Sequence, residues 1–144
     1  MYHAHILLIE DNLPDAKLFS SCISEIDPNI SVTVITSGHE AKYRLLSSLY
    51  NNQRLPDLVV LDINIPPYNG LELLKTFKKV EFLRDIPVVS YTTSNRPEDV
   101  ERAREFEANA YVVKPLDLEK LMLAVMDIHC ILTKSKPVPF YIEY

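Results

Sequence analysis

The amino-acid sequence predicts an α/β fold in which helices cover both faces of a doubly wound, five-stranded parallel sheet. Two observations support this prediction. Short apolar runs rich in Val, Ile and Leu alternate regularly with helix-length segments along the 144 residues, and such runs are typical of strands buried in a parallel sheet. Crossovers between parallel strands are right-handed, which limits the topologies that this alternation allows.

Five strands are expected. Four are nearly continuous apolar runs, and the second in chain order alternates β-branched residues with others. The predicted strands cover residues 5–9, 31–36, 58–61, 87–91 and 110–113.

Five helices follow the strands, each recognised by apolar residues three or four positions apart. The first ends at 27–29, and a polar loop at 51–54 precedes the third strand. The fourth begins at 96–99, with proline near its first turn, and its thin apolar stripe predicts a loosely held helix. The stripes are Phe19, Cys22, Ile23 and Ile26; Ala41, Leu45, Leu46 and Leu49; Leu71, Leu74, Phe77 and Val80; Val100, Ala103 and Phe106; and Leu118, Leu121, Met122, Val125 and Leu132.

The length allows one domain with its own hydrophobic core, expected over residues 1–135. Residues 136–144 form a short apolar and aromatic tail that we expect to dock on a protein surface.

The formal charge of −5 and the scattered basic residues argue against nucleic-acid binding. Because no apolar stretch is long enough to cross a bilayer and no signal peptide is recognised, we expect a cytoplasmic protein without membrane association.

Charged and hydroxyl side chains stand at the ends of four predicted strands. Glu10 and Asp11 follow the first, Asp62 the third, Thr92 the fourth and Lys114 the fifth. Because parallel strands share one carboxyl-terminal edge, where open α/β sheets bind ligands, these side chains should converge. Each of these features taken alone would more often be a helix start, an N-cap or a turn. Their joint occurrence predicts a functional site.

Three close carboxylates repel one another unless one is protonated or a cation lies among them. Mg²⁺ fits such a pocket, and a backbone carbonyl near Asn64 could complete its ligands. Together with Lys114 and Thr92, this set of groups is typical of phosphoryl transfer. The only glycines are Gly38 and Gly70, so no Gly-rich loop is available to hold a nucleotide. The phosphoryl group must therefore come from a small donor or another protein.

The sequence resembles the receiver domain of bacterial two-component response regulators, which has a flavodoxin-like (βα)5 fold. The resemblance covers residues 5–134 and rests on Ile-Glu-Asp-Asn at 9–12, Leu-Asp-Ile-Asn-Ile-Pro at 61–66, Gly70, Tyr-Thr-Thr-Ser at 91–94 and Tyr-Val-Val-Lys-Pro at 111–115. It implies a magnesium-dependent switch, rather than an enzyme, with self-catalysed phosphotransfer and slow autodephosphorylation. A sensor histidine kinase would be the phosphoryl source.

The resemblance also implies a role for each matching residue. Asp62 would be the phosphoacceptor, and Glu10, Asp11 and Asp62, with the Asn64 carbonyl, would hold magnesium. Lys114 would contact the phosphoryl group, Thr92 would be the switch hydroxyl and Tyr111 the aromatic ring that follows it. Pro115 resembles the cis-proline of the family.

A narrower resemblance is to the stand-alone receivers of cyanobacterial and bacterial phytochrome kinases. It rests on residues 61–67, the polar loop before 56–57 and the Thr-Thr-Ser triplet. It implies a single-domain regulator without an output domain, which signals through the surface of the fourth helix, fifth strand and fifth helix. We expect a homodimer through that face, with apolar residues of the fifth helix and the tail contributing. These residues are Met122, Met126, Ile131, Val138, Phe140, Tyr141 and Ile142.

Two alternatives remain open at this stage. A phosphohydrolase of the haloacid-dehalogenase type also uses a strand-end Asp, magnesium, Thr and Lys. Such enzymes need a second Asp two residues after the nucleophile, where this chain has Asn64. A degenerate receiver acting as an unphosphorylated scaffold would lack a pocket residue, and no pocket residue is missing.

Overall fold

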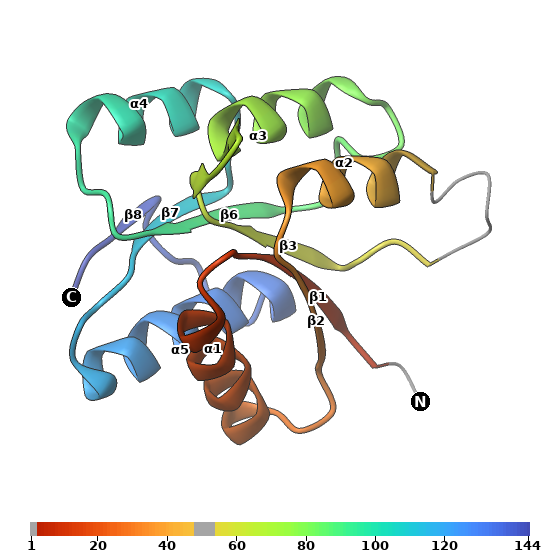
Figure 1. The fold of residues 1–144 in the computed structure, drawn as a ribbon. Helices are drawn as coiled ribbons and strands as arrows, with labels where there is room; N and C mark the ends of the chain where they lie inside the picture. The colour runs from red at the N-terminus through yellow and green to blue at the C-terminus, as the bar shows by residue number, and fades with distance from the viewer. Residues whose placement is uncertain (1–2, 48–53) are drawn as a thin grey trace.

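The structure, a computed structural model, describes residues 3–47 and 54–144. Within these ranges the chain alternates strands and helices around one twisted sheet (Figure 1). The sheet has the strand order β2-β1-β3-β6-β7-β8, and all five pairings are parallel. Its strands are β1 His5–Ile9, β2 Ser31–Ile35, β3 Leu58–Leu61, β6 Val88–Thr92, β7 Ala110–Val113 and β8 Tyr141–Ile142.

The prediction of a doubly wound parallel α/β fold is confirmed, but the sheet has six strands rather than five. The sixth strand, β8, comes from the tail, which pairs with β7 of its own domain. A small hairpin, β4 Asn64–Ile65 with β5 Tyr68–Asn69, was not expected, because strands of two residues have no measurable periodicity. Strand β6 extends one residue further than expected, so Thr92 is its last residue.

Five helices cover the two faces of the sheet. Helices α1 and α5 lie on one face, and α2, α3 and α4 lie on the other (Figure 1). Their bounds are α1 Leu13–Ile26, α2 Gly38–Ser47, α3 Gly70–Lys79, α4 Pro97–Glu105 and α5 Leu118–Thr133. The expected looseness of α4 agrees with its burial, since Val100 and Ala103 are its only buried residues.

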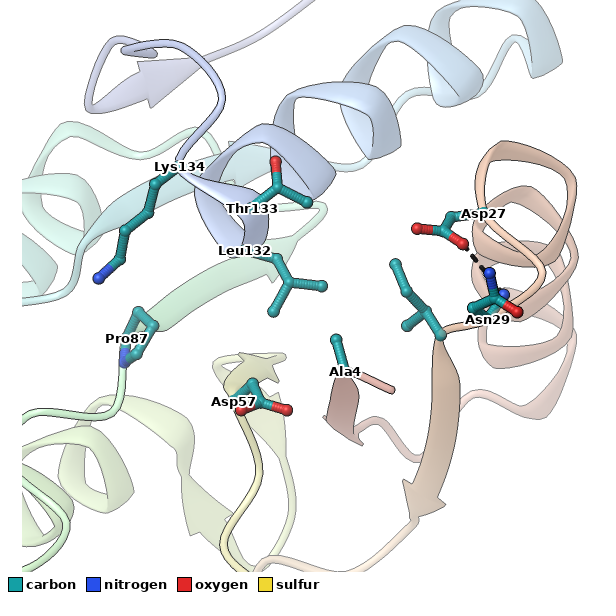
Figure 2. Close-up of a pocket in the computed structure, with 9 residues that line it drawn as sticks. Ala4, Asp27, Asn29, Asp57, Pro87, Leu132, Thr133 and Lys134 are labelled. Atoms are coloured by element: carbon teal, nitrogen blue, oxygen red, sulfur yellow. Dashed lines mark hydrogen bonds between the residues drawn. The ribbon is translucent and has the colours of Figure 1, made fainter. Parts of the chain in front are cut away.

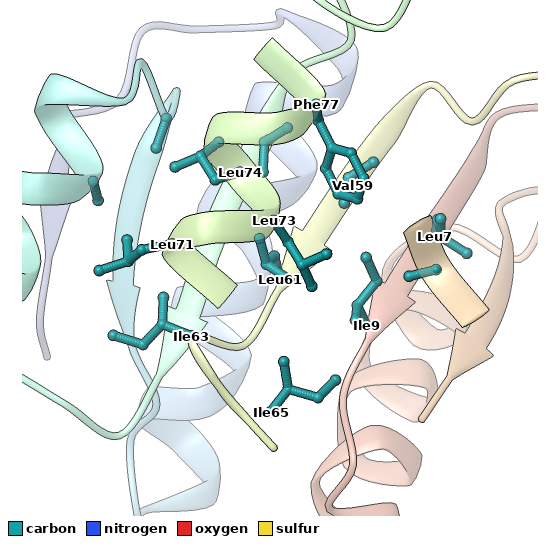
Figure 3. Close-up of a cluster of buried hydrophobic side chains, with 14 of the residues drawn as sticks. Leu7, Ile9, Val59, Leu61, Ile63, Ile65, Leu71, Leu73, Leu74 and Phe77 are labelled. Atoms are coloured by element: carbon teal, nitrogen blue, oxygen red, sulfur yellow. The ribbon is translucent and has the colours of Figure 1, made fainter. Parts of the chain in front are cut away.

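The alternation of side chains along each strand divides the core into two clusters. In β1, Leu7 and Ile9 point toward α2, α3 and α4 (Figure 3). Ile6 and Leu8 point to the opposite side, where Phe19 of α1 and Val125 of α5 lie. Because both faces are covered, β3 and β7 are apolar at every position and β1 at every position after His5, which explains the continuous apolar runs in the sequence.

Short polar caps start the helices that follow three of the strands. The side chain of Asn12 accepts a hydrogen bond from the Asp15 amide at the start of α1. Asn69 accepts from Leu71 at α3, and Asp117 accepts from Lys120 at α5. Each cap satisfies a backbone N–H group of the first helical turn that has no partner within the helix.

Three further features concern the limits of the described residues, the cysteines and the lengths of the helices. Leu49 and residues 51–53 lie outside the described residues. Cys22 is buried and Cys130 is half-buried, and both are free thiols. Within the described residues, no helix is long and apolar enough to span a membrane.

Candidate functional site

The strand-end residues singled out in the sequence converge at the carboxyl edge of the sheet. Glu10, Asp62, Thr92 and Lys114 are the buried charged or hydroxyl residues at this edge, while Asp11 is exposed. Glu10 follows β1, Asp62 follows β3 and Lys114 follows β7. The register of the parallel pairings brings these strand ends side by side, since Ile9 pairs with Leu61 and Thr92 pairs with Val113.

Three carboxylates form a compact oxygen cluster. One oxygen from each of Glu10, Asp11 and Asp62 lies within 4.8 Å of the others. Burial raises the pKa of Glu10 to about 7, although the Lys114 ammonium acts in the opposite direction. The Oε1 atom of Glu10 is buried, and the Lys114 ammonium is the group that it contacts. A buried oxygen of this kind, in a set of hard oxygen ligands, fits a divalent cation such as Mg²⁺.

Lys114 brings one positive charge into this acidic pocket. Its Nζ lies 3.0 Å from an oxygen of Asp62, 3.0 Å from an oxygen of Asp15, and in contact with Glu10. Burial alone would lower the pKa of Lys114, but hydrogen bonding to Glu10 and the charge of Asp62 outweigh burial and raise it. The lysine is therefore an ammonium at neutral pH.

The loop after β3 fixes the Asp62 carboxylate. The Asp62 amide donates to the carbonyl of Ile9 at 3.0 Å. One carboxylate oxygen of Asp62 accepts a hydrogen bond from the Asn64 amide at 2.9 Å, and the other faces Lys114. The Asn64 side chain reaches across to Thr92 Oγ1 at 3.5 Å. The expected role of the Asn64 carbonyl as a metal ligand stays a prediction.

Thr92 and Tyr111, the expected switch pair, both bond to Ser94. Thr92 is fully buried, and its hydroxyl accepts a hydrogen bond from the Ser94 amide at 3.3 Å. Tyr111 is also fully buried, and its hydroxyl donates to the Ser94 carbonyl at 2.9 Å. Ser94 in turn bonds to Asp99 of α4 at 2.6 Å. A continuous path of contacts therefore leads from the pocket to α4 and β7.

Two residues differ from the sequence-based expectations. Pro115 does not follow a cis peptide, because the cis bond within the described residues is Pro66–Pro67. Instead, the Lys114 amide donates to the Thr92 carbonyl at 2.7 Å, and this bond continues the β6–β7 ladder to the pocket.

Asp15 was not recognised as a site residue, because a single acid in a first helical turn is ordinary. Its Lys114 partner is 99 positions away.

A separate cavity of about 530 Å³ lies at the opposite edge of the sheet (Figure 2). Its two acids are already engaged in local structure. Asp27 accepts a hydrogen bond from the Asn29 amide, and Asp57 pairs with Arg54 and accepts from the His5 amide. The acidic pocket at the carboxyl edge is therefore the better candidate for chemistry.

The fold and the pocket together define a receiver-like α/β protein with an acidic, lysine-bearing site. The model of the response regulator receiver domain family matches residues 6–126. The chain therefore belongs to the response regulator receiver family.

Two relatives illustrate this similarity. The probable methanogenesis regulatory protein FilR2 of Methanothrix harundinacea is 35% identical over 123 residues, which cover 85% of this chain and 79% of FilR2. Response regulator Rcp1 of Synechocystis is 30% identical over 135 residues, covering 93% of this chain and 92% of Rcp1.

Solved structures agree with these sequence matches. The crystal structure of the phosphorylated cyanobacterial phytochrome response regulator RcpA superposes with a TM-score of 0.86 at 30% identity, covering 96% of this chain and 99% of RcpA. The Mn²⁺-bound form of Rcp1 gives a TM-score of 0.82 at 30% identity, covering 94% and 99%. A related chain thus binds a divalent cation.

Proposed function

We propose that this protein is a magnesium-dependent phosphorylation switch whose phosphoacceptor is Asp62. The observation that carries the proposal is the convergence of Glu10, Asp11, Asp62 and Lys114 in one pocket at the carboxyl edge of the sheet. Oxygen ligands for a cation, a carboxylate nucleophile and an ammonium are the groups that phosphoryl transfer to a carboxylate requires.

In the proposed reaction, a carboxylate oxygen of Asp62 attacks the phosphorus atom of a phosphohistidine on a sensor kinase. A phosphorus–oxygen bond forms as the phosphorus–nitrogen bond breaks, and the electron pair of the broken bond stays on the imidazole. Glu10, Asp11, Asp62 and the Asn64 carbonyl would hold magnesium, which when bound neutralises charge on the transferred oxygens. Lys114 would orient the phosphoryl group and neutralise part of its charge, because its ammonium lies 3.0 Å from an Asp62 oxygen.

The signal would leave the site through Thr92, Ser94 and Tyr111. A phosphoryl group on Asp62 adds charge and acceptor oxygens. Thr92 would turn its hydroxyl toward one of these oxygens and give up its bond to the Ser94 amide. Because Ser94 also bonds to Tyr111 and to Asp99, the surface of α4, β7 and α5 would shift toward a second arrangement. A protein partner that prefers this arrangement would receive the signal.

We further propose that the phosphoryl source is a phytochrome-type sensor histidine kinase. Support comes from the similarity to RcpA, which is described as a phytochrome response regulator, over nearly the full length of both chains. Turnover of a phosphate ester is not favoured, because the side-chain amide of Asn64 does not ionise near neutral pH and cannot serve as a general acid or base. A purely structural scaffold is not favoured either, since every expected pocket residue is in place.

The phosphorylation proposal is tested by incubating the protein with acetyl phosphate and magnesium. We expect incorporation of one phosphoryl group, observed by mass spectrometry on the intact chain, and its loss when magnesium is chelated. The Asp62→Asn variant should show no incorporation, because an amide is a far weaker nucleophile. Asp85→Asn serves as the matched control, because it makes the same substitution at an exposed position before β6, outside the pocket. Unchanged labelling of Asp62→Asn would overturn the assignment.

We also propose a homodimer through α4, β7, β8 and α5. The structure gives this face a smaller apolar patch than the sequence suggested. Met126 is 47% exposed, whereas Ile142 is buried beneath the sheet edge. Tyr144 is exposed to a similar extent, 46%, and lies next to α5, where its hydroxyl contacts Asp127. Two-fold pairing uses one self-complementary patch on both subunits, and Met126 and Tyr144 would belong to that patch.

The dimer proposal predicts that the phosphorylated protein sediments as a dimer at micromolar concentration. Met126→Glu should shift it to the monomer, because two charges would then meet at the two-fold interface. Lys17→Glu, at an exposed position of α1 outside the proposed α4, β7, β8 and α5 interface, is a control for a charge change elsewhere on the surface. A monomer both before and after phosphorylation would rule the proposal out.

A further inference from the structure

Lys114 is surrounded by three carboxylates, and one of them lies outside the acidic cluster. We propose that Asp15 is an exchangeable counter-ion of Lys114, which competes with the incoming phosphoryl group for the ammonium and so restrains phosphorylation. This inference rests on the proposed function and adds a positioning residue to it. Asp15 acts through Lys114 and does not itself touch the reacting atoms.

The ammonium of Lys114 has no spare donor in this structure. An ammonium carries three N–H groups, and three carboxylates face it, those of Glu10, Asp15 and Asp62. To bond a phosphoryl oxygen, Lys114 must therefore give up one of these partners. The three partners differ in how easily they can be released.

Burial identifies the partner that is released most easily. The side chain of Glu10 is fully buried and that of Asp62 is 8% exposed, whereas that of Asp15 is 32% exposed. A carboxylate that separates from an ammonium must find water or another hydrogen-bond donor. A buried carboxylate has no access to water, so breaking its ion pair costs more free energy. Asp15 can turn to solvent, while Glu10 cannot.

The local structure of α1 places Asp15 beside the pocket. Asn12 caps the helix by accepting the Asp15 amide at 3.0 Å, which fixes the first turn relative to Glu10 and Asp11. Among the described residues, the cluster able to hold a metal consists of Glu10, Asp11 and Asp62. Removing the Asp15 charge therefore leaves that ligand set complete.

Two physical effects of Asp15 act in the same direction. It occupies an N–H group that the phosphoryl group needs, and its negative charge repels a donor that is itself an anion. For a partly exposed ion pair we expect the removal of this charge to raise the second-order rate constant of labelling about two- to fivefold. Binding of beryllofluoride, an anion that imitates a phosphoryl group, should tighten by a similar factor.

The test measures labelling by acetyl phosphate at saturating magnesium in four single variants. Asp15→Asn replaces the carboxylate by a neutral amide, and Asp15→Ser replaces it by a hydroxyl. Because both variants remove the charge, both should be labelled faster than the wild type. Asp15→Glu keeps the charge, so its rate constant of labelling should be within about twofold of the wild-type value. Glu25→Gln removes the same charge from an exposed site further along α1 and should have no effect. Calorimetry of beryllofluoride binding gives a second readout that requires no turnover.

A double-mutant cycle tests whether Asp15 acts through Lys114. In a Lys114→Ala background, Asp15→Asn should lose most of its effect on beryllofluoride affinity, because the ammonium for which it competes is absent. Equal or slower labelling of both uncharged variants would overturn the inference, as would a full effect in the Lys114→Ala background. If the wild type itself is not labelled, the proposed function fails instead, so the two failures are distinguishable.

Discussion

Replacing Gly70 by alanine is expected to lower the free energy of unfolding by about 2–4 kcal/mol and to suppress labelling of Asp62. A Cβ at this position would lie 2.4 Å from the carbonyl oxygen of Asp62 and 2.5 Å from the Cα of Ile63. Both atoms belong to the backbone, so no side-chain rotation can relieve the clash. The Gly70 amide also donates to the Ile63 carbonyl at 2.8 Å, which holds the two segments together.

The consequence for function follows from the position of this contact. The crowded backbone is the segment that carries the Asp62 carboxylate toward Glu10 and Lys114. A shift of a few tenths of an ångström there would loosen the carboxylate cluster and the Asn64 hydrogen bond to Asp62. We therefore expect weaker magnesium binding and slower labelling even under conditions where the variant remains folded.

Gly38→Ala is the matched control, because it adds the same methyl group at the start of another helix. Its Cβ would lie 3.0 Å from Cδ1 of Leu73 and 3.1 Å from Cβ of Tyr68, which are side-chain atoms that can move slightly. Urea unfolding should show a loss of about 1 kcal/mol or less for this variant. Equal losses for the two variants, or normal labelling of Gly70→Ala, would contradict the explanation.

Removal of residues 137–144 is expected to lower the free energy of unfolding by about 2–4 kcal/mol, because the tail is part of the core. Ile142 is 4% exposed and pairs with Val112, while the Tyr111 amide donates to the Phe140 carbonyl at 2.7 Å. The guanidinium of Arg104 lies 4.2 Å from the centre of the Phe140 ring. Without the tail, the edge of β7 and one side of Tyr111 become open to water.

Two single variants separate packing from chain length. Ile142→Ala should account for about 2 kcal/mol or more of the loss, since it leaves a cavity under the sheet edge. Glu143→Gln, at the neighbouring and more exposed position, should change stability by less than about 0.5 kcal/mol. Urea unfolding at several protein concentrations distinguishes lost packing from a lost dimer, because only the latter depends on concentration. Unchanged stability of the truncated chain would show that the tail does not belong to the core.

Most of the fold could be predicted from the sequence because buried parallel strands are marked locally. Strands β1, β3 and β7 have the predicted bounds, since both faces of these strands are covered and every position except His5 is apolar. The site followed from the same pattern. Residues such as Glu10 and Asp62 are placed by the end of a strand, and parallel strands end at one edge.

The tertiary structure decided the features that depend on contacts between distant segments. Strand β8 has two residues, and whether it pairs with its own β7 or with another chain depends on how the tail turns after α5. The Asp15–Lys114 ion pair depends on the tilt of α1 against the sheet, and Ser94 joins Thr92 to Tyr111 only after β6 and β7 have paired. The periodicity of the sequence indicates which face of a helix or strand a residue occupies. The contacts above depend instead on the relative position of two elements, and only the packing of the whole core fixes that position.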